Sequence, residues 1–461
     1  KIPNITIDDK SIEELEGDGD GIANPGELIS LKISLNNYLD PYTGLAWLPA
    51  ENLSATLTCN YPGITIEQNT AAYGTLYPGS TMWNHNQPFT FSSVAGLASE
   101  PIPFELVVSA NASAPFPYTK TLTFTVQLSL IQEGWPFDLG GATNSSPILV
   151  NLDSDPDLEI VFGDHAGNIH ALKKDGSTQM PGFPISLSSA VIGSLAMTDL
   201  NADGIKEFAA CLQNNSIVFF NSQGTVLWTT PAGGTLRSGP VIASLKNDSS
   251  RQIITATQAG NLIVLNSDNT PYPNFPVSIG GAILGPPAIA DLNGDGKYDI
   301  IVATLNGNLS AINSATGQNL SGFPVAMQGG TQNPITIANL DADPSPEIIV
   351  TTSTSGNILA YNHDGSQFFQ RAVGGQIKTG AVVADVNNDG NKEIVVVAAN
   401  GTVYILNPNG TDLPNTPVMV NQAVDCTPTV ARFDGDNYAG IIFGDTNGRI
   451  HSVRADGTES P

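Results

Sequence analysis

The stretch Asp291–Asp299, DLNGDGKYD, decides how this 461-residue chain is interpreted. It lies between two short apolar runs, PPAIA before it and IIVA after it. Four similar stretches start at Asn151 (NLDSDPDLE), Asp199 (DLNADGIKE), Asn339 (NLDADPSPE) and Asp385 (DVNNDGNKE), and two degenerate ones start at Ser244 (SLKNDSSRQ) and Arg432 (RFDGDNYAG). The starts are 45 to 48 residues apart. A fixed period of this size is typical of solenoids and propellers, so the chain is an array of one repeated unit.

The order of elements inside one repeat indicates which array this is. In the first copy the apolar runs are Pro147–Val150, Ile160–Phe162, Ile169–Leu172 and Gly182–Leu187 (GFPISL), joined by the acidic loop, an AGN turn and a DG turn. Four short strands joined by tight turns form a meander of the size of one propeller blade. We see no amphipathic helical window between residues 135 and 461. The sequence therefore predicts an all-β fold whose residues 135–461 form a seven-bladed β-propeller of four-stranded blades.

The two ends of the array predict how the ring closes. GWPFDL at Gly134–Leu139 matches GFPISL at Gly182–Leu187 but precedes the first acidic loop, and the last repeat lacks such a segment. We therefore expect Trp135–Leu139 to be the outer strand of the last blade, which contains Phe433 to Val453. Closure of this kind removes an exposed sheet edge.

The acidic loops carry oxygen ligands at positions 1, 3, 5 and 9, which can converge on one hard cation. Calcium takes about 6–8 oxygen ligands and tolerates irregular cages better than magnesium does. Asp, Asn and Gly also form ordinary turns, but five loops in register favour calcium. The candidate ligands are Asn151, Asp153, Asp155, Asp157 and Glu159; Asp199, Asn201, Asp203 and Glu207; Asp291, Asn293, Asp295 and Asp299; Asn339, Asp341, Asp343 and Glu347; and Asp385, Asn387, Asp389 and Glu393.

The two degenerate loops are expected to lack the metal. Lys246 stands at the third ligand position of the third repeat and Arg432 at the first position of the seventh. We expect each cationic side chain to take the place of the metal in its own loop.

The repeated loop after a short apolar strand resembles the FG-GAP or VCBS-type repeats of secreted bacterial proteins and the calcium-binding blades of the integrin α-subunit propeller. The resemblance covers residues 135–461 and implies calcium loops on one face of the disc, with glycan or protein partners at the opposite face. Pro156 and Pro344 depart from the family pattern, which has a glycine there. The family includes adhesins, lectin-like modules, lyase domains and appendages of peptidases, so the resemblance predicts the fold better than the function.

Residues 1–130 have a different pattern. Leu31, Ile33 and Leu35 alternate with polar residues, as do Leu53, Ala55 and Leu57. Such alternation is typical of half-buried antiparallel strands. At this length an Ig-like β-sandwich is the expected class.

This first domain has its own acidic motif, EGDGDGIANPGE at Glu16–Glu27. Its spacing fits a twelve-residue calcium loop, although Pro25 and the strand that follows exclude a true EF-hand. Two interpretations of this motif are a calcium site and a solvated turn. We favour calcium, which together with the five propeller loops gives an expected total of about six ions. The candidate ligands are Glu16, Asp18, Asp20, Asn24 and Glu27.

Composition limits the partners and the compartment. With 43 acidic and 17 basic residues the formal charge is −26, which argues against nucleic acid and anionic membranes. No apolar run reaches 18 residues, so no membrane span is expected. The three cysteines are far apart in sequence, which disfavours a disulfide framework. These features favour an extracellular or cell-surface protein.

Catalytic motifs of the common hydrolases are absent from the sequence. His170 and His451 occupy the same strand position of their repeats and are interpreted as repeat residues, not as a catalytic pair. The favoured hypothesis is a non-catalytic, calcium-stabilised binding or scaffolding module of a secreted or cell-surface bacterial protein. The alternatives are the accessory C-terminal region of a secreted hydrolase such as a peptidase, and a calcium-dependent polysaccharide lyase. The scarcity of lysine and arginine speaks against the lyase.

Overall fold

The computed structural model describes residues 2–17, 21–39, 48–94, 97, 101–111, 117–129, 135, 137–153, 155–174, 176, 179–200, 203–432 and 439–458. The chain divides into two compact units, residues 1–137 with 175–178 and residues 138–174 with 179–461. Every element in the described part is a strand. The prediction of an all-β protein is confirmed.

The N-terminal unit consists of two antiparallel sheets that share one hydrophobic core. The predicted alternation is confirmed, because Leu31 and Ile33 of one sheet and Leu53 and Leu57 of the other are buried in that core. The first sheet has the order β1 (Ile5–Glu16), β2 (Leu28–Asn37), β7 (Phe89–Ser93), β4 (Ile64–Gln68), with β6 (Thr81–Trp83) also beside β2; the second has the order β5 (Thr70–Leu76), β3 (Ala50–Thr58), β8 (Pro101–Ala110), β9 (Tyr118–Gln127).

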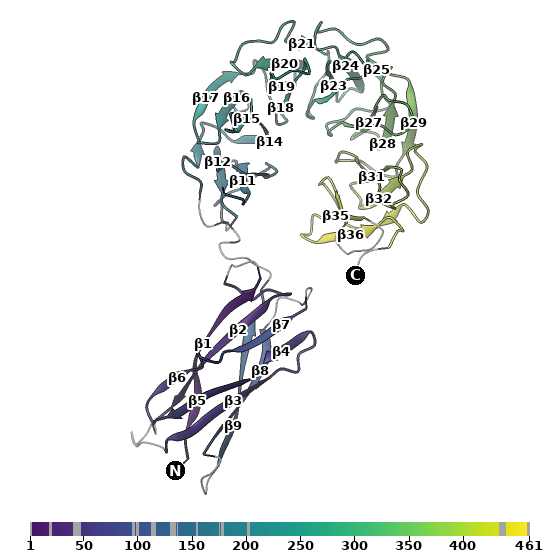
Figure 1. Cartoon of the computed structure of the whole chain (residues 1–461). Helices are drawn as coiled ribbons and strands as arrows, with labels where there is room; N and C mark the ends of the chain where they lie inside the picture. Colours follow the sequence, from purple (N-terminus) through teal and green to yellow (C-terminus); the bar gives the residue numbers. More distant parts are fainter. Residues whose placement is uncertain are drawn as a thin grey trace. The chain divides into compact units, whose positions relative to one another are not determined.

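The C-terminal unit is a β-propeller whose seven sheets follow one another around a common centre in chain order (Figure 1). Within the described residues, six sheets have four strands and the seventh has three. Blades 1 to 4 are β10 (Ile148–Val150), β11 (Glu159–Gly163), β12 (Asn168–Leu172), β13 (Ile185–Ser186); β14 (Val191–Thr198), β15 (Glu207–Leu212), β16 (Ser216–Asn221), β17 (Val226–Pro231); β18 (Val241–Ala243), β19 (Gln252–Ala256), β20 (Asn261–Asn266), β21 (Val277–Ser278); and β22 (Ala288–Ala290), β23 (Asp299–Ala303), β24 (Asn308–Ile312), β25 (Val325–Ala326). Blades 5 to 7 are β26 (Thr336–Ala338), β27 (Glu347–Thr351), β28 (Asn357–Tyr361), β29 (Gln367–Ala372); β30 (Val382–Ala384), β31 (Glu393–Val397), β32 (Thr402–Leu406), β33 (Val418–Met419); and β34 (Thr429–Ala431), β35 (Gly440–Gly444), β36 (Ile450–Arg454).

The core of the propeller lies between neighbouring blades. The second strand of blades 3, 4, 5 and 6 is buried at every position, so both of its faces are covered. Ile301 of blade 4, for example, shares one cluster with Ile348 and Val350 of blade 5. This explains why these strands are continuous runs of isoleucine and valine and do not alternate with polar residues.

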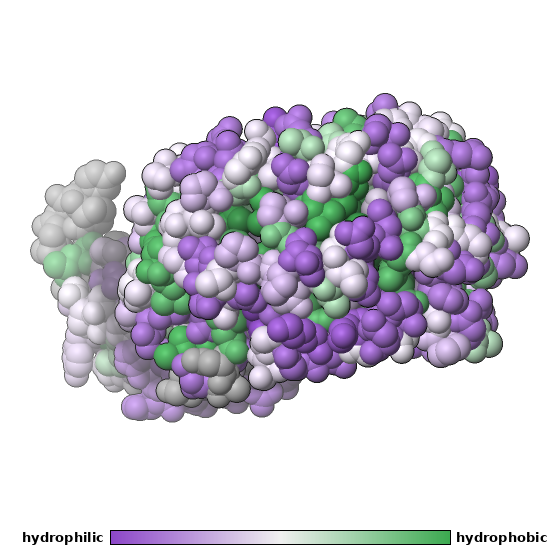
Figure 2. Space-filling view, turned by 90° about the horizontal axis from the view of Figure 1, so that it is seen from above, coloured by the Kyte–Doolittle hydropathy of each residue, from purple (hydrophilic) through white to green (hydrophobic). Residues whose placement is uncertain are grey.

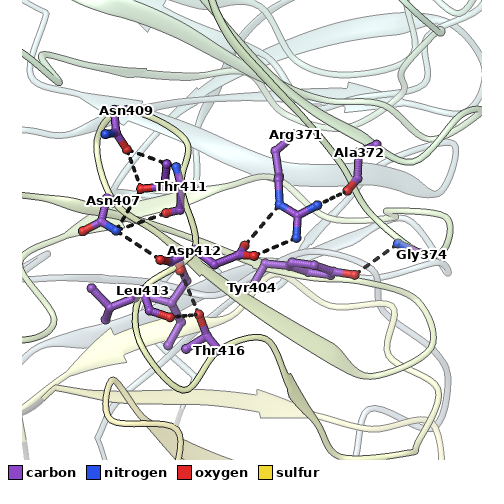
Figure 3. Close-up of polar contacts among 11 residues, drawn as sticks. Arg371, Ala372, Gly374, Tyr404, Asn407, Asn409, Thr411, Asp412, Leu413 and Thr416 are labelled. Atoms are coloured by element: carbon purple, nitrogen blue, oxygen red, sulfur yellow. Dashed lines mark hydrogen bonds and ion pairs between the residues drawn. The ribbon is translucent and has the colours of Figure 1, made fainter.

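Polar contacts add to this packing at the edge between blades 5 and 6 (Figure 3). Arg371 donates two hydrogen bonds to the Asp412 carboxylate, at 3.1 and 2.8 Å, and its guanidinium lies 5.7 Å from the centre of the Tyr404 ring. On the side shown in Figure 2, hydrophobic residues form separate patches among hydrophilic ones. That view shows no single broad apolar face of the kind that marks a large hydrophobic interface.

The antiparallel meander assigns each connection to one of two faces. The acidic loop joins the first and second strands at one face, which we call the loop face. The turn between the second and third strands, and the connector that leads to the next blade, lie at the other face, which we call the connector face. One backbone hydrogen bond joins turn and connector in all seven blades, as in His165 N–H to Ala142 O and Gln258 N–H to Thr235 O.

The predicted closing strand is not found among the described residues. Trp135 and residues 137–139 have no strand assignment, and the described part of the last sheet ends at β36. In blades 1 to 6 the residue after the outer strand donates to the turn glycine or its equivalent, as Leu187 does to Gly167 O, but Leu139 makes no such bond to Gly448 O. Pairing of this segment with the last blade stays a prediction, because residues 134 and 136 lie outside the described residues.

Candidate functional site

The acidic loops share one internal hydrogen bond, made by the residue at position 9. In blades 1 to 6 its side-chain oxygen accepts the N–H of the residue at position 2. In blade 5 Leu340 N–H donates to Glu347 Oε2 at 2.6 Å, and in blade 6 Val386 N–H donates to Glu393 Oε2 at 2.9 Å. Blade 4 uses Asp299 in the same way, at 3.2 Å. The ninth residue begins the second strand and is buried there, which fixes the loop above it.

Burial destabilises the charged form of these carboxylates unless a cation lies near them. It raises the pKa of Asp299 to about 6, with further elevation from the charges of Asp295 and Asp291. Burial likewise raises the pKa of Glu207, Glu347 and Glu393, the neighbouring aspartates adding to the effect. The second oxygens of Glu347 and Glu393 are buried and have no hydrogen-bond partner in the described chain. A divalent ion would supply the missing partner and reverse these shifts.

Two acidic clusters have the geometry to hold a metal ion. In blade 1 the carboxylates of Asp153, Asp155 and Glu159 offer ligand oxygens that all lie within 4.8 Å of one another. In blade 5 Asp341, Asp343 and Glu347 do the same. These loops are the two with asparagine at position 1 and proline at position 6, so they form one class.

Blades 2, 4 and 6 form a second class, with aspartate at position 1, asparagine at position 3 and glycine at position 6. The first aspartate accepts the glycine N–H, as Asp291 Oδ2 does from Gly296 at 2.8 Å. A proline has no N–H to donate. In the first class Asn339 instead donates its Nδ2 to the carbonyl oxygen of Asp343. The prolines Pro156 and Pro344, where the family pattern has glycine, thus occur in the loops whose first residue is asparagine and not aspartate.

Three predicted ligands, Asp18, Asp20 and Asn201, lie outside the described residues, and the others occupy their loops. The Glu16–Glu27 motif connects β1 and β2, where Asn24 N–H donates to the buried Glu27 at 2.7 Å. Gly21 N–H donates to Glu14, a residue outside the predicted ligand set. The end of β1 has three glutamates, Glu13, Glu14 and Glu16, and the sequence gave no signal that Glu14 would turn toward the loop.

Blade 1 contains a competitor that the loop pattern did not reveal. The Lys173 ammonium lies 3.1 Å from Asp153 Oδ2 and 3.2 Å from Asp155 Oδ2, between two candidate ligands. Asp157 pairs with Lys174 at 3.1 Å. Position 173 follows the third strand, and blades 4 and 5 have Asn313 and Asn362 there. This repeat comparison is the sequence signal that could have identified Lys173.

The expectation that Lys246 and Arg432 replace a metal in their own loops stays a prediction. The Lys246 ammonium lies 5.6 Å from the centre of the Tyr272 ring. Hydrogen bonds from Ser250 and the charge of Lys246 lower the pKa of Asp248 in the same loop. Arg432 reaches the neighbouring loop of blade 6, donating to Asn388 Oδ1 at 3.0 Å. The rest of its own loop, residues 433–438, lies outside the described residues.

The connector face carries two adjoining polar pockets, each with a volume of about 470 Å³. The first is lined by blades 1, 2 and 3, including His165 and Gln213, and the second by blades 3 to 6, including Asn333 and Lys378. Arg237 belongs to both. Because four blades line the second pocket, it lies at the mouth of the central axis.

Each of the repeated histidines pairs with an aspartate of its own blade. His170 Nε2 lies 3.0 Å from Asp164 Oδ2 in blade 1, and His451 Nε2 lies 3.0 Å from Asp445 Oδ2 in blade 7. Asp164 also accepts the Asn168 N–H at 2.7 Å. These pairs brace the turn between the second and third strands, which agrees with interpreting both histidines as repeat residues. All three cysteines are free thiols, so no disulfide joins Cys211 to Cys426.

Comparison with known proteins identifies the fold. Residues 348–459, less than half of the chain, match a family model described as the lambda-carrageenase beta-propeller domain. The biofilm matrix protein Bap1 of V. cholerae aligns with a TM-score of 0.50 at 14% identity, covering 72% of this chain and 82% of that chain. BamB from Moraxella catarrhalis (TM-score 0.47, 16% identity, 70% and 83% covered) and Sqt1 of Saccharomyces cerevisiae (0.47, 14%, 77% and 90%) are also similar.

A search of the curated proteins found no match. Within the described residues there is no helix long and apolar enough to cross a membrane. The seven sheets, the carrageenase-type match and the likeness to Bap1 together show that the C-terminal unit is a β-propeller built of repeated blades.

Proposed function

We propose that this chain is a non-catalytic, calcium-stabilised binding module of a secreted or cell-surface protein, with FG-GAP or VCBS-type blades and an Ig-like N-terminal sandwich. The main observation in support is that the two propeller faces contain different kinds of site. The acidic loops, with their buried ninth carboxylates, all lie at the loop face, and both polar pockets lie at the connector face. Calcium holds the blades in place, and a ligand binds where the metal does not.

The proposed metal agrees with the donor set of the loops. Carboxylate and amide oxygens are the ligands that calcium prefers, whereas zinc and copper sites use histidine or cysteine. The two clusters of three carboxylates contain neither of these residues. Asp153, Asp155 and Glu159 would hold the ion in blade 1, and Asp341, Asp343 and Glu347 in blade 5.

A glycan is the favoured ligand, and a carbohydrate-active enzyme is the favoured setting for the accessory-region alternative. The match of residues 348–459 to a carrageenase propeller supports both choices over a peptidase appendage. The module itself is proposed to be non-catalytic because the described residues lining the two pockets include no carboxylate. Glycoside hydrolysis generally requires a pair of them.

A glycan array probed with the whole 461-residue chain tests this proposal. We expect binding to a defined set of glycans in calcium, and weaker binding when a chelator destabilises the blades. Release of reducing ends or of unsaturated uronates from a bound glycan would overturn the non-catalytic assignment. Absence of binding to every glycan, with the protein shown to be folded, would overturn the choice of ligand.

A further inference from the structure

The connector face differs in charge from the rest of the molecule. Among the described residues its turns and connectors contain four carboxylates, Asp138, Asp164, Asp425 and Asp445, in a chain with 43 acidic residues. None of the four is among the described residues that line the pockets. Asp164 and Asp445 are each paired with a histidine. The pocket mouth is therefore a region of low negative charge on a strongly acidic protein.

Two cations converge on this region from distant parts of the chain. Arg237 lies in the connector before β18 and lines both pockets, and Lys378 lies in the connector before β30 and lines the second. Arg237 donates one hydrogen bond from Nε to Gln258 Oε1, at 3.0 Å, which orients the guanidinium. None of the ion pairs in the described chain includes Arg237 or Lys378. Both side chains are exposed and can reach a ligand.

The remaining polar lining consists mainly of carboxamides, including Asn144, Gln213, Gln332 and Asn333. Carboxamides both donate and accept hydrogen bonds, as sugar hydroxyl groups do. Asn333 is 3% exposed and donates its Nδ2 to Thr351 O, Thr351 Oγ1 and Ile377 O. Its Oδ1 is buried with no partner in the described chain, so this pocket wall retains an unsatisfied acceptor.

From these observations we propose that the two pockets form one continuous site for an anionic oligosaccharide, in which Arg237 and Lys378 bind sulfate or carboxylate groups and the carboxamides bind hydroxyls. A guanidinium offers a planar pair of donors to either anion. The described carboxamides of the lining match the combined donor and acceptor character of saccharide hydroxyls, which the carboxylate side chains of an acidic peptide lack. A saccharide therefore fits this lining better than an acidic peptide does. The inference rests on the proposed function and specifies the ligand class.

The test is a calorimetric titration of the calcium-loaded full chain with four probes: a sulfated galactan hexasaccharide, a uronate hexasaccharide, a neutral galactan hexasaccharide and a poly-glutamate peptide of matched charge. We expect one or both anionic hexasaccharides to bind at least about tenfold more tightly than the neutral one. The comparison of the sulfated with the uronate hexasaccharide identifies the preferred anion. The double variant Arg237→Gln/Lys378→Gln should lose at least about tenfold in affinity, and Arg237→Lys/Lys378→Arg should retain most of it. Lys10→Gln, which removes an exposed charge from the N-terminal unit, is the matched control and should bind as the unchanged protein does.

Equal binding of neutral and anionic sugars, or an unchanged affinity of the double variant, would overturn this inference but leave the proposed binding function intact. Equally tight binding of the poly-glutamate peptide would overturn the saccharide assignment. If neither these probes nor any arrayed glycan binds the folded protein, the proposed function fails as well.

Discussion

The loops of blades 3 and 5 have the same shape but opposite charge. In each, the residue at position 9 accepts the N–H from position 2, through Gln252 in blade 3 at 2.9 Å and Glu347 in blade 5 at 2.6 Å. In each, the aspartate at position 5 accepts the N–H two residues later, at 2.8 Å for Asp248 and 2.7 Å for Asp343. Blade 3 nevertheless has Lys246 at position 3, where blade 5 has an aspartate.

This comparison separates what the turn needs from what a metal needs. The loop of blade 3 folds with one carboxylate and two basic residues in SLKNDSSRQ, so the turn requires only an acceptor at position 9 and an aspartate at position 5. The carboxylate at position 3 and the negative charge at position 9 of blade 5 are therefore not needed to form the turn. Close carboxylates repel one another, so these additional charges point to a cation.

The largest expected effect follows from removing calcium. Each site adds about 2.7 kcal/mol at a hundredfold excess of calcium over its dissociation constant, so chelation should lower the melting temperature by more than about 10 °C. Hydrogen exchange at single amides provides an internal reference, because blade 3 is expected to bind no metal. In chelator the amide of Leu340 in blade 5 should exchange faster, whereas that of Leu245 in blade 3 should change little. An unchanged melting curve, with the metal shown to be gone, would mean that the loops are ordinary acidic turns.

A single substitution makes blade 5 resemble blade 3. Glu347→Gln keeps the acceptor for Leu340 N–H, as Gln252 shows, but removes the charge. We expect the bound calcium count to fall by one and stability in calcium to fall by about 3 kcal/mol, with little loss in chelator. Elemental analysis and thermal melts measure both.

Gln252→Glu is the matched control for that substitution. It should add no metal, because Ser244 and Lys246 still occupy ligand positions 1 and 3 of blade 3. Calcium binding by this variant, or an unchanged count in Glu347→Gln, would contradict the assignment of the ninth carboxylate as a ligand.

The pH dependence should change sign with calcium. Burial raises the pKa of Asp299 from 3.8 to about 6, so in the metal-free protein the unfolded chain ionises first. The contribution of this protonated carboxyl is fully present below about pH 3.8 and is lost as the pH rises through 6. In chelator, Asp299→Asn should therefore leave the melting temperature unchanged near pH 4 and raise it by on the order of 5 °C at pH 7. In calcium the same variant should be less stable than the parent at pH 7. A variant with the same effect at both pH values in chelator would contradict the raised pKa.

The local sequence pattern predicted the repeat and most of the contacts inside each acidic loop. The features that it did not predict depend on contacts between distant parts of the chain. The period and the apolar runs predicted the sheets because each blade is a continuous segment of chain. Convergence of Arg237 and Lys378 could not be predicted, since it depends on how blades 3 and 6 close around the axis. Pairing of Trp135–Leu139 with the last blade depends in the same way on a tertiary contact between the two ends of the array, so it stays a prediction.

The smallest expected effect concerns blade 1, which belongs to the same loop class as blade 5 but has Lys173 against its ligands. For calcium to bind, the ammonium must leave Asp153 and Asp155, and its charge still opposes the ion. Lys173→Asn restores the residue found after the third strand of blades 4 and 5. It should raise calcium affinity in blade 1 by roughly fivefold, the scale of an exposed ion pair. Calcium titration followed by exchange of the Leu152 amide, which donates to Glu159 at 2.7 Å, measures this site alone. The Leu340 amide of blade 5 should titrate as before, and an equal shift at both amides would show that Lys173 acts on the whole propeller and not on its own loop.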